Sequence, residues 1–226
     1  ADVVVSAVHG FTGTRGVSPA TVDRDGNVNL VDAAKASGAD VVLMSVVGAA
    51  PDSPMELFAM KYAAERYLFD SGVPATVVRS TAFLELWLGL LRQTAGRSGR
   101  PLVFGRGRNP INFVSVADVA ALVERVVIDP ATRGQTLEIG GPENVTFDDL
   151  AARVTAASGG TGRPRHVPTP ALRGMSATLG RLRPDLGRMA RAALAMDSID
   201  MTFDSAASAT GFPDLPCTPL AEVLHR

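Results

Sequence analysis

Only two of the 22 Lys and Arg residues in this chain are lysines, Lys35 and Lys61. Arginine stays charged in proteins, whereas a lysine amine can lose its proton, so a rare lysine is a candidate for chemistry. Lys61 is the stronger candidate because it shares a helical face with Leu57, Ala64 and Leu68. Two interpretations are open. Either its stem packs on the core with the ammonium in water, or the amine points into a cleft, where it would act as a general base.

Three further polar residues lie near the ends of predicted strands. Ser45 is close to the carboxyl end of a buried strand, the end at which open parallel sheets bind ligands. His9 follows the first strand, where a histidine is usually structural but can also contact a ligand. Arg79 ends the third strand. It either binds a phosphate or carboxylate or forms a salt bridge, for example with Glu56 or Glu85.

Gly10, Gly13 and Gly16 follow the first strand in a G-x-x-G-x-x-G spacing. A dinucleotide-binding loop enters its helix inside such a motif, so that helix amides face the pyrophosphate. Here Ser18 and Pro19 predict a helix that begins only after the last glycine. No acidic residue closes the next strand to bind a ribose. We therefore interpret the segment as an ordinary loop, with a phosphate-binding loop as the weaker alternative.

The composition argues against several classes of protein. A formal net charge of −1 gives no bulk attraction to nucleic acid or to an anionic membrane. The single cysteine, Cys217, excludes a disulfide within this chain and fits a reducing compartment. The richest apolar run, residues 41–50, is too short to span a bilayer. No group of residues has metal-ligand spacing. We expect a cytoplasmic protein with no metal, nucleic-acid or membrane partner.

Apolar runs and helix-type periodicity alternate along the chain, which predicts an α/β fold. Continuous apolar strands indicate a parallel sheet with helices on both faces. Ser53, Ser115 and Thr146 mark helix starts, each with an acidic residue three positions later. Strands are predicted over 2–8, 40–47, 75–79, 111–114 and 135–139, and helices over 19–37, 53–70, 83–92, 115–128 and from 146 onward. The composition changes near residue 159, so we predict two parts, residues 1–158 with the sheet and 159–226 as a small, mainly helical cap.

Several short segments occur in a recognisable order. They are SAV at 6–8, DGNVNLVDAAK at 25–35, VVLMS at 41–45, KYAAE at 61–65, SGVP at 71–74, TVVR at 76–79, NFVSVADVA at 112–120 and IGGPE at 139–143. Together they resemble the NmrA-like group of the atypical short-chain dehydrogenase/reductases. The resemblance covers roughly residues 1–157.

This resemblance implies an NAD(P)-binding Rossmann-like domain over residues 1–158 and a substrate-side cap over 159–226. It implies an NAD(P)H-dependent oxidoreductase for a small carbonyl, enone or quinone-like substrate, with NADP favoured and NAD possible. Ser45 and Lys61 match the catalytic serine and lysine of the family. Ser45 would bind the substrate carbonyl, and Lys61 would orient the nicotinamide ribose or act as general base. The implied cofactor-binding residues are Ser6, Ala7, Val8, His9, Gly10, Ser45, Lys61, Arg79, Ser80, Thr81 and Phe83.

The chain departs from the family pattern in two ways. The tyrosine position four residues before the lysine holds Leu57, and Tyr62 and Tyr67 are out of register on the helix. A non-catalytic NAD(P)H sensor is therefore the alternative function, and a relative of the nucleotide-sugar epimerases is a weaker one. Residues 2–8 match the fourth strand of the family, so we expect the first three strands and the main phosphate loop to be missing. The sheet edge thereby exposed would favour aggregation or a homodimer.

Overall fold

The computed structural model describes residues 1–13, 16–207 and 212–224. Its contacts divide the chain into two compact units, and the predicted division at residue 158 does not coincide with a boundary between them. The division at residue 158 between a cofactor-binding part and a substrate-side cap stays a prediction. The first unit comprises Ala1–Ser80, Val119–Ile139 and Ala209–Leu215, and the second comprises Thr81–Asp118, Gly140–Ser208 and Pro216–Arg226.

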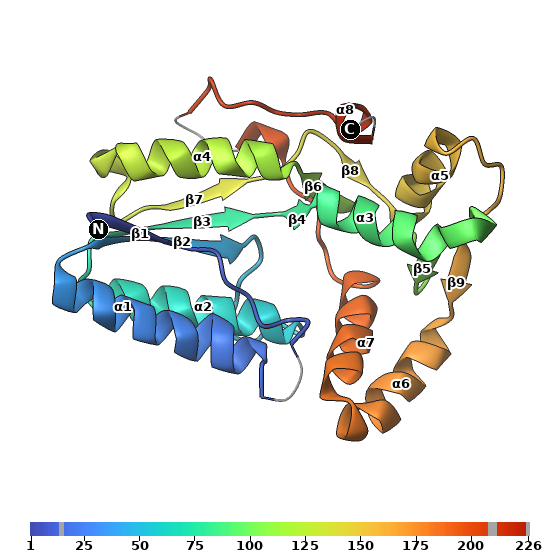
Figure 1. The fold of residues 1–226 in the computed structure, drawn as a ribbon, viewed down its shortest axis with the longest axis horizontal. Coiled ribbons are helices and arrows are strands. Elements are labelled where there is room, and N and C mark those ends of the chain that lie inside the picture. Colours follow the sequence, from blue (N-terminus) through green and yellow to red (C-terminus); the bar gives the residue numbers. More distant parts are fainter. Residues whose placement is uncertain (14–15, 208–211, 225–226) are drawn as a thin grey trace. The chain divides into compact units, whose positions relative to one another are not determined.

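A parallel four-stranded sheet forms the centre of the first unit (Figure 1). Its strands are built from the continuous apolar runs, so the predicted parallel sheet is confirmed. In the register, Ser6 lies opposite Leu43 and Ser45 lies opposite Arg79. The strand order is β1 (Val3–Ser6), β2 (Asp40–Val46), β3 (Ala75–Ser80) and β7 (Thr136–Ile139).

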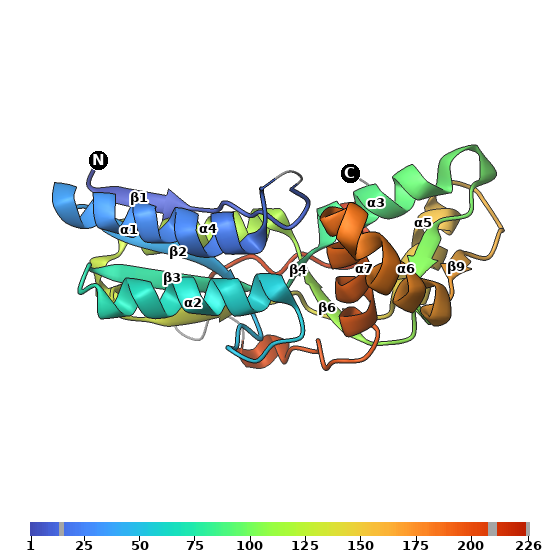
Figure 2. The ribbon, with the colours of Figure 1, turned by 90° about the horizontal axis from the view of Figure 1, so that it is seen from below.

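Helices cover both faces of this sheet. Helices α1 (Asp25–Ser37) and α2 (Glu56–Asp70) lie on one face, and α4 (Val116–Ile128) lies on the other (Figures 1 and 2). Because side chains alternate along a strand, every second residue of β2 and β3 faces α1 and α2. The buried cluster on that side comprises Val31, Ala34, Ala39, Val41, Leu43, Ala64, Leu68, Val73, Ala75 and Val77.

The predicted helix starts are correct in part. Thr146 begins α5 (Phe147–Ala157) with the predicted capping box, in which Asp149 reciprocates. The prediction at Ser53 is wrong. Helix α2 begins later, with Met55 as its N-cap, and the Ser53 hydroxyl instead accepts a bond from the Met55 amide. Ahead of α1, residues Ala20–Arg24 form a π-helical turn, a local widening that apolar periodicity does not reveal.

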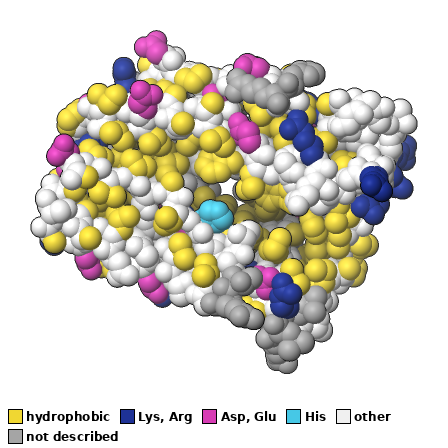
Figure 3. Space-filling model, in the orientation of Figure 1, with side chains coloured by type: hydrophobic (Ala, Val, Ile, Leu, Met, Phe, Trp, Pro, Cys, Tyr) yellow, Lys and Arg dark blue, Asp and Glu magenta, His cyan; other side chains and the backbone are white. Residues whose placement is uncertain are grey.

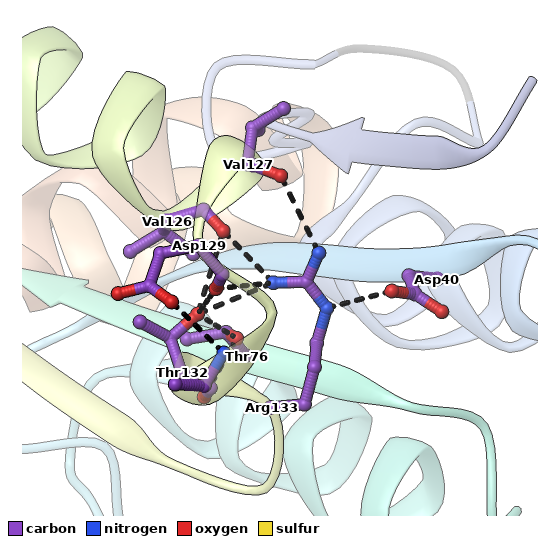
Figure 4. A network of polar contacts seen from close by, with 8 residues as sticks. Asp40, Thr76, Val126, Val127, Asp129, Thr132 and Arg133 are labelled. Atoms are coloured by element: carbon purple, nitrogen blue, oxygen red, sulfur yellow. Dashed lines mark hydrogen bonds and ion pairs between the residues drawn. The ribbon is translucent and has the colours of Figure 1, made fainter.

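Arg133 secures the sheet on the side of the amino end of β2 (Figure 4). Its Nε lies 2.8 Å from Asp40 Oδ2, and its Nη1 donates to the Val126 carbonyl at 2.8 Å. Thr76 donates to the Thr132 carbonyl at 2.9 Å in the same network. The bond from Arg133 to Val126 satisfies a carbonyl group at the end of α4, where the last carbonyls have no partner within the helix.

β1 is an edge strand, because only β2 pairs with it among the described residues. Val5 and Val8 are 44% and 47% exposed. Hydrophobic side chains also cover much of the left part of Figure 3, where Figure 1 places β1. The expected exposed edge is therefore present, while the homodimer stays a prediction. None of the described helices combines the length and apolarity needed to cross a membrane.

The second unit contains short strands and most of the C-terminal helices. Helices α6 and α7 form the helical part expected after residue 159. The strands β4, β5, β8 and β9 have only two or three residues, too few for sequence patterns to reveal. The elements are β4 (Ala82–Phe83), β6 (Ile111–Val114) and β8 (Asn144–Val145), β5 (Leu102–Phe104) with β9 (Arg165–Val167), and α3 (Leu84–Ala95), α6 (Thr169–Leu182), α7 (Pro184–Met196) and α8 (Leu220–Leu224).

Candidate functional site

Hydrogen bonds hold both ends of the segment 6–10 after β1, while its middle is exposed to solvent. Ser6 is buried, and its hydroxyl donates to Asn27 Oδ1 at 2.6 Å. Gly10 is also buried, and its amide donates to Asp23 Oδ2 at 2.8 Å. Between these anchors the side chains at 7–9, which include His9, are exposed. The predicted cofactor segment 6–10 thus has a fixed backbone with exposed side chains at the carboxyl end of an edge strand.

Lys61 points from α2 toward this segment. It is only 4% exposed, and its Nζ donates to the Val8 carbonyl at 2.9 Å. Asp23 Oδ1 lies 3.1 Å from the same nitrogen. The ammonium is therefore not held in bulk water, as one interpretation required. A lysine ammonium has three N–H donors, and the Val8 carbonyl is its one hydrogen-bond acceptor among the described residues, so at least one donor is left for a further oxygen.

Ser45 and the half-buried Arg79 form a second group, joined by the buried Glu65. The Ser45 hydroxyl donates to Glu65 Oε1. Arg79 binds both oxygens of the same carboxylate, with Nε at 3.1 Å from Oε1 and Nη2 at 2.7 Å from Oε2. Hydrogen bonding to Glu65 raises the pKa of the Arg79 guanidinium above its ordinary value. The salt-bridge interpretation of Arg79 is correct in kind, but the partners are Glu65 and Glu138.

The remaining predicted cofactor residues fall on either side of the boundary between the units. Ser80 is buried at the end of β3, and its carbonyl accepts from the Val47 amide at 2.9 Å. Thr81 belongs to the second unit, where its hydroxyl donates to Asn112 Oδ1 at 2.9 Å. Phe83 is the half-buried N-cap residue of α3. Among the described residues of the first unit, no hydrogen bond or ion pair joins the Lys61 group to the Ser45 group.

The glycine-rich segment packs against its own chain. A Cβ atom at Gly10 would collide with the Ser18 carbonyl, and one at Gly13 would collide with Val17. The helical turn begins at Ala20, after the last glycine, as Ser18 and Pro19 predicted. Residues 14–15 lie outside the described residues. The amides of Gly10 and Gly13 already donate to Asp23 Oδ2 and to the Gly10 carbonyl, which favours the ordinary-loop interpretation because a pyrophosphate needs free amides.

The tyrosines do not replace the phenol missing at Leu57. Tyr67 is exposed and donates to Asp32 Oδ1 at 2.6 Å. This hydrogen bond raises the pKa of the Tyr67 phenol above its ordinary value. A phenol that holds its proton more tightly is a poorer proton donor. Tyr62 is half-buried on the same helix. No group of three or more His, Cys, Asp or Glu side chains in the described residues could hold a metal.

Three residues of this site escaped the sequence reasoning, namely Asp23, Asn27 and Glu65. A signal existed for each of them. Asn27 is in helical register with the apolar residues Val31 and Ala34, and Asp23 lies one turn earlier. Glu65 follows Lys61 by four residues, which places both side chains on one face of α2.

Comparison with known proteins gives the family. The model of the NmrA-like family matches residues 2–207 of this chain. The chain is 26% identical over 131 residues to an NAD(P)H azoreductase of Xenophilus azovorans, and 29% identical over 131 residues to quinone oxidoreductase 2 of Escherichia coli. Each of these matches covers 58% of this chain and 45% of the relative. The chain thus spans less than half the length of these curated relatives in the match.

Solved structures support the same fold. A nucleoside-diphosphate-sugar epimerase of Staphylococcus aureus gives a TM-score of 0.76 at 22% identity, over 100% of this chain and 76% of that chain. The NADPH complex of the Escherichia coli quinone oxidoreductase gives 0.75 at 23% identity, over 99% and 74%. The NADP(H) complex of triphenylmethane reductase from Citrobacter sp. gives 0.75 at 18% identity, with the same shares. This chain belongs to the NmrA-like family, and its first unit has the parallel α/β fold of NAD(P)-binding proteins.

Proposed function

We propose that this chain forms the nicotinamide side of an NAD(P)H-dependent oxidoreductase acting on a small quinone-like, enone or carbonyl substrate. The observation that carries the proposal is the buried Lys61 ammonium, held beside the carboxyl end of β1 with at least one N–H donor that no described residue accepts. Membership of the NmrA-like family supports it, as do relatives described as an NAD(P)H azoreductase and a quinone oxidoreductase. NADPH is favoured over NADH because similar solved structures hold NADPH or NADP(H).

The residues of the first unit fit the nicotinamide ribose of such a cofactor better than its pyrophosphate. Lys61, the Val8 carbonyl and the exposed segment 7–9 offer a donor, an acceptor and an open backbone to a ribose. The loop at Gly10 and Gly13 suits a pyrophosphate poorly, because both amides already donate within the chain, to Asp23 Oδ2 and to the Gly10 carbonyl. We therefore assign only the nicotinamide-ribose contacts to these residues.

The chain's own residues would bind and orient rather than transfer protons. A bound nicotinamide would supply the hydride. Lys61 would donate its unused N–H to a ribose or substrate oxygen, because a lysine ammonium has donors and no acceptor. Ser45 would have to leave Glu65 to donate to a substrate carbonyl, although its oxygen could still accept a bond. Leu57 supplies no acid. A substrate protonated by water would suit this arrangement.

The alternative is a non-catalytic NAD(P)H sensor. Two observations favour it, namely Leu57 at the tyrosine position and the hydroxyl of Ser45 committed to Glu65. Both proposals require cofactor binding, and only the first requires turnover. The exposed Cys217 in a chain without a disulfide supports a cytoplasmic location for either.

The test is titration of the chain with NADPH and NADH by calorimetry, followed by NADPH oxidation with a panel of quinones, enones, azo dyes and aldehydes. Steady oxidation that is lost in Lys61→Met supports the oxidoreductase. Binding without oxidation of any panel member supports the sensor. Absence of binding, or oxidation unaffected by Lys61→Met, would overturn the assignment of this site.

A further inference from the structure

Asp23 is completely buried, with an exposed fraction of 0%. A carboxylate without solvent is costly unless charges or hydrogen bonds compensate it. Asp23 lies in the π-helical turn Ala20–Arg24, and such turns are frequent at functional sites. Neither the family resemblance nor the sequence pattern gives this residue a role, so its contacts need an explanation.

The contacts of Asp23 reach both parts of the proposed cofactor site. Oδ2 accepts from the Gly10 amide at 2.8 Å. Oδ1 lies 3.1 Å from Lys61 Nζ and has no hydrogen-bond partner among the described residues. The Asp23 carbonyl accepts from Asn27 Nδ2 at 2.7 Å, and Asn27 in turn accepts from Ser6. One buried carboxylate therefore joins the lysine on α2 to the segment after β1.

We propose that Asp23 is a positioning residue for Lys61. Its Oδ1 holds the ammonium beside the Val8 carbonyl, and its Oδ2 holds the Gly10 amide, so the lysine and the segment 6–10 keep one relative position. An N–H donor of Lys61 is thereby kept available for one ligand oxygen. Only the identity of that oxygen rests on the proposed function. A purely stabilising ion pair, such as Asp40 with Arg133, is the competing explanation.

Asp23→Asn separates the two contacts of the carboxylate. Asparagine has the same shape, and its amide oxygen can still accept from Gly10, but its NH₂ group cannot bind an ammonium. Asp40→Asn is the matched control. It breaks a partly buried ion pair at the other end of the sheet, far along the chain from the segment 6–10. It should lower stability without releasing Lys61.

The first readout does not depend on activity. The chain has only two lysines, so brief acetylation followed by peptide mass spectrometry compares Lys61 with the exposed Lys35 in the same molecule. We expect the Lys61 to Lys35 labelling ratio to rise about tenfold in Asp23→Asn, the coupling typical of residues in contact. The ratio should not change in Asp40→Asn. An unchanged ratio in Asp23→Asn would overturn the proposal, as would an equal rise in the control.

The second readout is a double-mutant cycle on the Kd of NADPH. Asp23→Asn should weaken binding about tenfold in the wild-type background and not at all in the Lys61→Met background. A structural role would weaken binding equally in both backgrounds and would refute positioning. If the wild-type chain binds no NADPH, the proposed function fails, while the labelling ratio still decides the role of Asp23.

The proposal can still be tested if Asp23→Asn is too unstable to fold. Asp23→Asn leaves Lys61 buried without its counter-charge, whereas Asp23→Asn with Lys61→Met removes both charges and should fold. Equal NADPH affinity of this double variant and of Lys61→Met supports the proposal. A tenfold weaker affinity of the double variant would contradict it.

Discussion

Glu65→Gln tests how much stability comes from the buried carboxylate that joins Ser45 to Arg79. In the structure this carboxylate accepts from the Ser45 hydroxyl and from two nitrogens of Arg79. Removing one partner of a buried ion pair usually costs about 3–5 kcal/mol. Arg79 keeps a 22% exposed side chain and a second carboxylate, Glu138, at 3.4 Å. We therefore expect a smaller loss of unfolding free energy, about 2–4 kcal/mol.

The assay is urea unfolding analysed by linear extrapolation. Asp70→Asn is the control, because it removes an exposed pair with Arg66 on the same helix and should cost less than about 0.5 kcal/mol. The slope of the transition should stay the same if only stability changes. A loss below about 1 kcal/mol for Glu65→Gln would refute the reasoning that the charge of this buried carboxylate stabilises the fold.

Three further predictions concern the fold, an ionisation and the sheet edge. Gly141→Ala would drive a Cβ atom into the Phe113 carbonyl and should lower the free energy of unfolding by at least about 2 kcal/mol. Gly26→Ala has room in α1 and should raise the free energy of unfolding by about 0.5–1 kcal/mol. Thermal and urea unfolding measure both changes. In a Tyr62→Phe background, ultraviolet titration should find the pKa of Tyr67 above its ordinary value, and Asp32→Asn should lower it. Because the folded-state pKa is raised, the stabilisation from this bond is present below the ordinary phenol pKa and is lost as pH rises through the raised value. Val5→Lys places a charge on the β1 edge and should abolish self-association in light scattering, and a persisting oligomer would show that another surface is the interface.

The sequence predicts the sheet well and the helix starts less well, for physical reasons. Buried parallel strands need continuous apolar runs, so residues 40–47 and 75–79 could be assigned from composition alone. A helix start depends on local hydrogen bonds that compete with one another. At Ser53 the hydroxyl accepts from Met55, and the helix begins only at Glu56.

The candidate site was predictable in its positions but not in its partners. The ends of parallel strands mark where ligands bind, and this rule led to Ser45. The scarcity of lysine and an apolar helical face led to Lys61. The charge that faces each of them comes from another element, 20 residues away for Ser45 and 38 for Lys61. The arginine at the end of β3 illustrates the difficulty. Glu85 was a reasonable partner for it by position, but its carboxylate binds Ser115 and the Val116 amide in the second unit.

The proposed function accounts for the burial of two ions on one helix face, which stability alone does not require. Lys61 and Glu65 are one turn apart on α2, and their side chains are 6% and 4% exposed. Apolar residues of similar volume often stabilise a core as well as a buried ion pair does. The Leu57, Ala64 and Leu68 positions show that this helix face accepts such residues. The charges instead lie where β1 and β2 end, and each holds a group that the family resemblance marks for cofactor or substrate. Asp40 and Arg133 pair at the opposite end of the sheet, where Arg133 also donates to a helix carbonyl that needs a donor whatever the chain binds. The contrast between these two ion pairs is why Asp40→Asn can separate a loss of stability from a loss of positioning.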